Sequence, residues 1–171
     1  MFWGPLSRQG LVIAIASAGI DQLAKLWLIY VFDLRARMPI QLLPFLDLVL
    51  VWNKGISYGL FQQEGPFGQW GLFALKIGAV ALLWLWLARA ESRLTATALG
   101  LIIGGAAGNA VDRLLHDAVA DFILFHITTD SINFNWYVFN LADAAIVAGV
   151  AGLLYESVFG DRAAKAPRSP L

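Results

Sequence analysis

The stretch GGAAGNAVDRL at residues 104–114 is followed by VADFILFH at 119–126 and by FNLAD at 139–143. These runs are mostly apolar, yet they carry Asp112, Asp121 and Asp143 in a protein in which only 14% of residues are charged. Each of these aspartates lies in or beside a segment that is hydrophobic enough to cross a membrane. A carboxylate in such a place is energetically costly, and for that reason it is a candidate functional residue.

The composition of the whole chain indicates a membrane protein. Its 171 residues are 59% hydrophobic and have a mean hydropathy of +0.68, which is more apolar than a soluble domain of this length. Twelve basic and twelve acidic side chains give a net charge of zero, so nothing indicates a nucleic-acid partner. The chain has no cysteine, and His116 and His126 form no metal-ligand pattern, so no metal or cofactor is expected.

The hydrophobic runs predict a single domain, residues 1–171, of the all-α membrane class. Four transmembrane helices are expected, joined by a surface cradle and a connector and followed by a disordered tail. The spans are expected at about 11–32, 69–88, 94–113 and 136–159, the cradle at 33–67, the connector at 114–135 and the tail at 160–171. Gly100, Gly104 and Gly108 have the small-xxx-small spacing that lets transmembrane helices approach closely.

Two segments between the spans are expected to contain extended chain. The run Phe45–Trp52 is too short to cross a membrane as a helix and is flanked by turn residues. The cradle is therefore expected to form one or two strands and a short surface helix near 57–62. In the connector, alternate residues from Val119 to Phe125 form the two sides of another strand. Backbone groups in such segments must be satisfied internally or at the interface, which predicts a small β-cradle on the membrane surface.

The distribution of basic residues predicts how the chain crosses the membrane. Six of them lie at the termini and between the second and third spans, and four lie on the opposite side. The first group is Arg8, Arg89, Arg93, Arg162, Lys165 and Arg168, and the second is Arg35, Arg37, Lys54 and Arg113. Because cytoplasmic loops carry an excess of Lys and Arg, both termini are expected in the cytoplasm and the acidic stretch on the outer, extracytoplasmic side.

The acids expected on the outer side can support two kinds of chemistry. Two close carboxylates share one proton, so that one can activate water while the other protonates or polarises a scissile amide. A set of acids within a membrane can equally form a proton or cation path, and composition and spacing do not separate these two readings. Serine catalysis is not indicated, because neither Ser57 nor Ser131 has an obvious paired base.

Two smaller polar features have two readings each. Asp21 and Lys25 lie four residues apart on one helical face, and they form either an internal ion pair or part of a polar site. Asn53 and Gly55 either make a simple turn or contribute to that same site.

Five motifs follow one another along the chain. They are Asp21-Gln22 with Lys25, Asn53-Lys54-Gly55, GGAAGNAVDR at 104–113, VADF at 119–122 and FNLAD at 139–143. Together they resemble the lipoprotein signal peptidase family, also called signal peptidase II, over essentially the whole chain. The resemblance implies an aspartic endopeptidase of the bacterial inner membrane that removes signal peptides from prolipoproteins. It implies cleavage N-terminal to a cysteine that carries a diacylglyceryl group, and inhibition by the cyclic peptide globomycin; the protein is expected to be monomeric in membrane lipid.

The resemblance also implies roles for individual residues. Asp121 and Asp143 resemble the catalytic dyad of the family. In the family, a polar shell orients the dyad and contacts the substrate or globomycin. The residues that resemble this shell are Asn53, Gly55, Asn109, Arg113 and Asn140. Asp21 and Lys25 resemble the polar pair on the first span, and the segment 33–67 resembles the cradle and short helix that clamp the substrate. The length and polarity of 128–135 depart from the family pattern, which affects the shape of a loop.

Asp112 is the alternative partner of Asp143. It is followed directly by Arg113 and shares a turn with Asn109, which suits a permanently ionised structural anion. Asp121 has no adjacent cation and lies on a connector expected to be mobile, which suits an acid that exchanges its proton. The sequence therefore favours Asp121 as the catalytic partner and Asp112 as a supporting residue.

Overall fold

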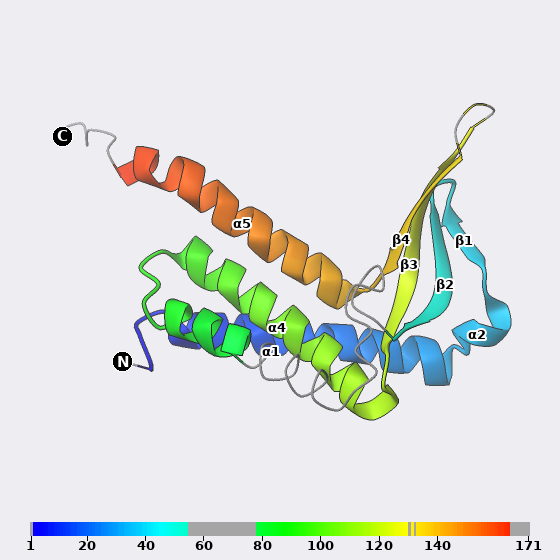
Figure 1. The fold of residues 1–171 in the computed structure, drawn as a ribbon, viewed down its shortest axis with the longest axis horizontal. Coiled ribbons are helices and arrows are strands. Elements are labelled where there is room, and N and C mark those ends of the chain that lie inside the picture. Colours follow the sequence, from blue (N-terminus) through cyan, green and yellow to red (C-terminus); the bar gives the residue numbers. More distant parts are fainter. Residues whose placement is uncertain (1, 55–77, 130, 132, 165–171) are drawn as a thin grey trace.

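The computed structural model describes residues 2–54, 78–129, 131 and 133–164. In this part of the chain a four-stranded antiparallel sheet stands across one end of the helices, and α1 begins and α5 ends at the other (Figure 1). The elements in chain order are α1 Ser7–Leu26 with its π-helical extension Trp27–Val31, α2 Leu34–Arg37, β1 Ile40–Leu43, β2 Leu46–Asn53, the helix Gly78–Leu87, α4 Arg93–His116, β3 Val119–Thr128, β4 Asn133–Phe139 and α5 Leu141–Ala164. Helix α4 packs against both α1 and α5, which contact each other much less.

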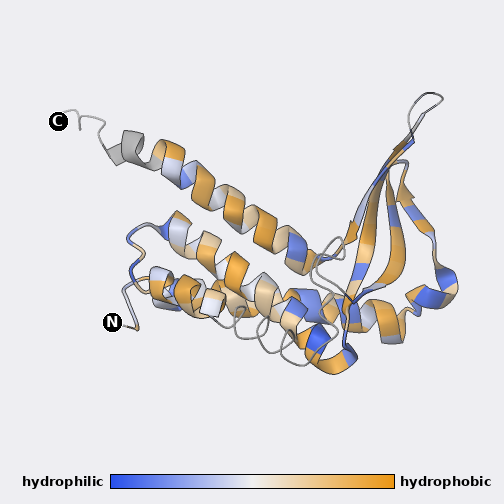
Figure 2. Ribbon diagram, viewed as in Figure 1, coloured by the Kyte–Doolittle hydropathy of each residue, from blue (hydrophilic) through white to orange (hydrophobic). Residues whose placement is uncertain are grey.

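Three helices in the described ranges are long and apolar enough to cross a membrane, namely Ser7–Val31, Arg93–His116 and Leu141–Phe159. The 24 residues of α4 extend about 36 Å at the usual helical rise, and the hydrocarbon core of a bilayer is about 30 Å thick. Figure 2 shows that apolar residues dominate these helices, while hydrophilic residues gather where the helices meet the sheet. The polar end of the bundle is therefore the end that carries the sheet.

Two expectations about the fold class are not confirmed. The expected second span, 69–88, is described only from Gly78, and its described part is the ten-residue helix Gly78–Leu87, so a count of four spans is not established. The all-α class does not describe the chain either, because the cradle and the connector pair with each other in a sheet. Their aromatic and β-branched residues favour extended chain.

The sheet has the strand order β1-β2-β3-β4 in the part of the chain described here. The strands expected within 45–52 and 119–125 are confirmed as β2 and β3, and Val51 pairs with Asp121 between them. The aromatic run from Trp136 to Phe139, expected to begin the last span, instead belongs to β4, which pairs with β3. Helix α5 starts at Leu141 and continues to Ala164, past the expected start of the tail. The helix expected near 57–62 lies outside the described residues.

The glycine spacing in α4 brings three helices into close contact. A Cβ on Gly104 would meet the backbone carbonyl of Ala14 in α1, and a Cβ on Gly105 would meet that of Ala142 in α5. A Cβ on Gly100 would lie 2.6 Å from the carbonyl oxygen of Gly10, which is closer than packed atoms allow. The missing side chains thus let α4 lie directly against both neighbours, and the small-xxx-small spacing predicts the contact with α1.

Gly104→Ala is expected to lower the midpoint of thermal unfolding in detergent. The added methyl group forces α1 and α4 apart at a backbone contact, at a cost of about 1–3 kcal/mol for an overpacked core. Gly19→Ala in α1 is the matched control, because nothing lies within 4 Å of the Cβ it would add. Equal midpoints for the two variants would contradict this account of the α1–α4 contact.

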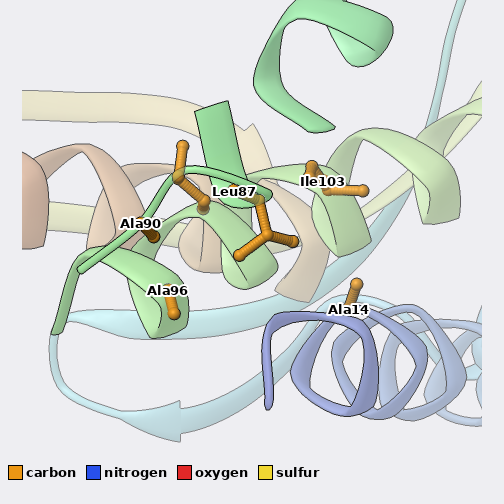
Figure 3. Close-up of a cluster of buried hydrophobic side chains, with 6 residues drawn as sticks. Ala14, Leu87, Ala90, Ala96 and Ile103 are labelled. Atoms are coloured by element: carbon orange, nitrogen blue, oxygen red, sulfur yellow. The ribbon is translucent and has the colours of Figure 1, made fainter. Parts of the chain in front are cut away.

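Two apolar clusters hold the elements in place. The first joins α1, the helix Gly78–Leu87 and α4 through small and branched side chains. Figure 3 labels five of its members, Ala14, Leu87, Ala90, Ala96 and Ile103. The second cluster packs Phe122 of β3 against Leu28 and Leu34, which follow α1. Because Phe122 is the neighbour of Asp121, this cluster fixes the position of that aspartate at the end of α1.

Candidate active site

Asp121 and Asp143 lie on different elements near the junction of sheet and helices. Asp121 is in β3 and is 3% exposed, and Asp143 is partly exposed in the first turn of α5. Strand β3 is paired with β2 on one side and β4 on the other. Asp121 therefore sits on a paired strand, which differs from the mobile connector expected from the sequence.

A single residue, Asn140, is bonded to both carboxylates. Its side-chain Nδ2 donates to Oδ1 of Asp121 at 2.6 Å, and its backbone N–H donates to Oδ2 of Asp143 at 3.2 Å. In return, Oδ1 of Asn140 accepts from the backbone N–H of Asp143 at 3.0 Å. This reciprocal pair is a capping box, in which a carboxylate three residues into the helix reaches back to the capping residue. The start of α5 thus sets the orientation of both acids.

Two further asparagines complete the hydrogen bonds of the pair. Nδ2 of Asn53, at the end of β2, donates to Oδ2 of Asp121 at 3.1 Å. Nδ2 of Asn109, in α4, donates to Oδ1 of Asp143 at 2.8 Å, and Oδ1 of Asn109 accepts from Asn140 at 3.0 Å. Each carboxylate oxygen of the two aspartates therefore has a nitrogen donor. Asn53, Asn109 and Asn140, all predicted as polar shell, are brought together here.

Lys25 lies at the centre of a buried ion cluster next to the aspartate pair. Its Nζ is 2.7 Å from Oδ2 of Asp21 and 2.8 Å from Oδ2 of Asp112, and these side chains are at most 4% exposed. The same Nζ donates to Oδ1 of Asn109 at 3.3 Å. The internal ion pair expected for Asp21 and Lys25 is thus confirmed, and Lys25 also contacts Asn109.

The acids of this cluster hold the backbone beside each aspartate of the pair. Oδ2 of Asp112 accepts from the backbone N–H of Ala120 at 3.0 Å, and Oδ1 of Asp21 accepts from that of Ala142 at 2.9 Å. Each alanine immediately precedes one member of the pair. Lys25 and its two acids therefore position the strand and the helix that carry Asp121 and Asp143.

The cation that pairs with Asp112 differs from the one expected. Arg113 donates from Nη1 to the backbone oxygen of Asn109 at 3.2 Å, while Asp112 is paired with Lys25. Consecutive residues of a helix point in different directions, so the sequence neighbour is a poor partner. Gln22 was missed as a site residue: its Nε2 donates to Oδ1 of Asp112 at 2.7 Å. Its place beside Asp21 in the first motif was the available signal.

The sequence as a whole supplies the family. Residues 13–159 match the sequence profile of the family described as signal peptidase (SPase) II. The chain belongs to the signal peptidase II family. It is 55% identical over 160 residues to the lipoprotein signal peptidase of Nitrobacter hamburgensis, with 94% of this chain and 98% of that relative covered. It is 52% identical over 160 residues to that of Rhodopseudomonas palustris, with the same shares covered.

The fold is also shared with a solved structure described as a bacterial membrane enzyme. The two chains superimpose with a TM-score of 0.70 at 23% identity, covering 95% of this chain and 94% of that one. At this identity the likeness concerns the fold. The fold of this chain is therefore one that a solved structure already shows. The resemblance of the five motifs to signal peptidase II is confirmed as membership of that peptidase family.

The surroundings of Asp121 favour its protonated form. Burial raises the pKa of Asp121 above its ordinary value, and the charge of Asp143 raises it further, while the hydrogen bonds from Asn53 and Asn140 and the charge of Lys25 oppose the shift. A buried acid of raised pKa beside a more exposed carboxylate is the arrangement in which a pair holds one proton. Within the described ranges no group of three or more His, Cys, Asp or Glu could hold a metal ion. Gly55, expected in the polar shell, lies outside the described residues.

Proposed function

We propose that the protein is an aspartic endopeptidase that removes signal peptides from diacylglyceryl-modified bacterial prolipoproteins. The observation that carries the proposal is the pair of carboxylates joined by Asn140, with Asp121 buried and Asp143 partly exposed. The proposal agrees with the names of relatives that are more than 50% identical to the chain.

The reaction uses the pair in its singly protonated form. Asp143, the more exposed carboxylate, accepts a proton from a water molecule as that water attacks the scissile carbonyl carbon. Asp121, which holds the shared proton, donates a hydrogen bond to the carbonyl oxygen and stabilises the tetrahedral intermediate. Collapse of the intermediate breaks the C–N bond, and the proton taken up by Asp143 passes to the nitrogen of the leaving amine. That amine is the α-amino group of the lipidated cysteine.

We propose that a lipid-anchored peptide reaches the site from the membrane. We propose that residues 69–88 form a second span, that 33–67 forms a substrate clamp, and that Arg113 and Gly55 contact the substrate. We place the site on the outer face of the bacterial inner membrane with both termini in the cytoplasm, and we take the protein to act as a monomer. The placement of the site at a membrane face is supported by the described polar side chains of the site, which lie at the sheet end of apolar helices.

The proposal is tested with purified protein and a diacylglyceryl-modified prolipoprotein in detergent. Cleavage on the N-terminal side of the lipidated cysteine, inhibited by globomycin, is the expected result; the unmodified prolipoprotein is the control and should remain intact. Cleavage of both forms alike would contradict the lipid requirement. Absence of cleavage together with ion flux through liposomes, unaffected by globomycin, would favour the alternative of a proton or cation path.

The cleavage rate is expected to fall as the pH rises through the raised pKa of Asp121. Above that pH the pair loses its proton, and below it Asp121 keeps the proton that the mechanism uses. Because the Asn53 hydrogen bond lowers this pKa, Asn53→Ala should move the alkaline limb of the pH–rate profile to higher pH. An unchanged limb, or a shift to lower pH, would contradict the assignment of the proton to Asp121.

A further inference from the structure

A second charged feature lies at the far end of the bundle from the aspartate pair. A pocket of about 540 Å³ opens between the segment before α1 and the turn that joins the helix Gly78–Leu87 to α4. Along α4, the distance from Arg93 in this pocket to Asp112 is about 29 Å at the usual helical rise. Because that distance is close to the thickness of a bilayer core, the pocket lies at the opposite membrane face from the site.

Tryptophans beside the pocket indicate its depth in the membrane. Trp3 and Trp84 have ring centroids 5.9 Å apart, and Nε1 of Trp84 donates to the backbone oxygen of Phe2 at 3.0 Å. Trp3 is 50% exposed and Trp86 is 49% exposed. Such side chains concentrate at the boundary between lipid and water. The pocket is therefore at the level of lipid headgroups.

The charge of the pocket is positive. Arg89 and Arg93 line it, both are exposed, and neither forms an ion pair with another residue in the described part of the chain. Glu91 is the acid among the lining residues, so two cations face one anion. Guanidinium groups bind phosphate through paired hydrogen bonds and give up their hydration more readily than an ammonium group. The pocket thus favours a phosphate-bearing anion.

The remaining walls distinguish a lipid from a free anion. They are formed by Pro5, Leu6, Ala88 and Ala90, of which the two alanines are buried. A soluble phosphate gains nothing from this apolar surface, whereas the glycerol backbone and first methylene groups of a phospholipid are removed from water against it. The pocket also opens at the depth where a phospholipid carries both groups.

We propose that this pocket binds the headgroup of an anionic phospholipid, with its phosphate between Arg89 and Arg93. The bound lipid bridges the segment before α1 and the beginning of α4, and so it stabilises the end of the bundle remote from the aspartate pair. The proposal does not depend on the peptidase function, because binding is measured without substrate.

The test uses the full chain in an uncharged detergent, titrated with short-chain phosphatidylglycerol and followed by thermal unfolding and by native mass spectrometry. Phosphatidylglycerol should raise the unfolding midpoint and bind about tenfold more tightly than phosphatidylcholine of the same chain length. The double variant Arg89→Gln/Arg93→Gln should lose that preference. Arg8→Gln, which removes a cation at the same end but outside the pocket lining, should keep it.

A third variant guards against loss of binding by misfolding. Glu91→Gln removes the acid of the pocket and should tighten the binding of phosphatidylglycerol, an effect that a damaged fold cannot produce. The proposal is overturned if Glu91→Gln has no effect, if the double variant retains wild-type affinity, or if the two lipids bind equally. Equal stabilisation by glycerol phosphate at the same concentrations would also overturn it, since the site would then be one for a free anion.

Discussion

Asp143→Asn and Asp121→Asn are each expected to reduce cleavage of a diacylglyceryl-modified prolipoprotein by about 10³-fold or more, the range for loss of a general acid or base. An amide in either position can neither take the proton from water nor hold the shared proton for the carbonyl oxygen. Both variants keep the size of the side chain and one of its two acceptor oxygens, so the fold should persist. Gel filtration and the midpoint of thermal unfolding check that it does.

Asp117→Asn is the matched control for this pair of substitutions. Asp117 is exposed, lies outside the site and has a φ of 55°, a backbone conformation that asparagine also adopts readily. Its cleavage rate should equal that of the wild type. Asp112→Asn should lower the rate or the stability only in part, through the hydrogen bond to Ala120 and the ion pair with Lys25. Full activity of Asp121→Asn with complete loss in Asp112→Asn would transfer the catalytic role to Asp112.

Lys25→Met should be the most destabilising single substitution among those considered. It leaves Asp21 and Asp112 as two buried carboxylates without their cation, and removing one partner of a buried ion pair costs about 3–5 kcal/mol. The measurement is the midpoint of thermal unfolding in detergent. Lys54→Met, which removes an exposed lysine, is the control and should leave the midpoint nearly unchanged.

A combined variant separates the charge effect from simple loss of packing. In Lys25→Met with Asp21→Asn and Asp112→Asn no buried charge remains in the cluster, so part of the lost stability should return. If the triple variant is no more stable than Lys25→Met, the uncompensated charges are not the cause of the instability. The cleavage rate of the triple variant should be below that of the wild type, because the amides bind the backbone of Ala120 and Ala142 less strongly than the carboxylates do.

Local sequence patterns predicted much of the fold. The apolar runs predict α1, α4 and α5, and the glycines at 100, 104 and 108 predict the close contact of α4 with α1. Alternation and turn residues predict β2 and β3. The prediction failed at Trp136–Phe139, where an aromatic run suits a membrane interface and a strand equally well. Pairing with β3, a contact between distant residues, decides in favour of the strand.

Pairwise contacts within the site were harder to predict. The three aspartates could be selected because carboxylates in apolar runs are costly, whereas the asparagines were selected through the resemblance to the family. The partner of Asp112 could not be predicted, because Lys25 is far away in the sequence and Arg113 is adjacent. Asn140 was selected as a polar residue, but its bonds to both carboxylates depend on where β3 lies relative to the first turn of α5.

The capping box at the start of α5 has a consequence for the biosynthesis of the protein. Asp121 leaves the ribosome before Asp143, and Asp143 reaches its orientation only when Asn140 caps a formed helix and Asp21 has bound the backbone of Ala142. A nascent chain that ends within β4 therefore holds one carboxylate without its partner. Under the proposed mechanism, hydrolytic activity begins only after α5 has formed and docked, so the growing chain is expected not to cleave neighbouring peptides in the membrane while it is being made.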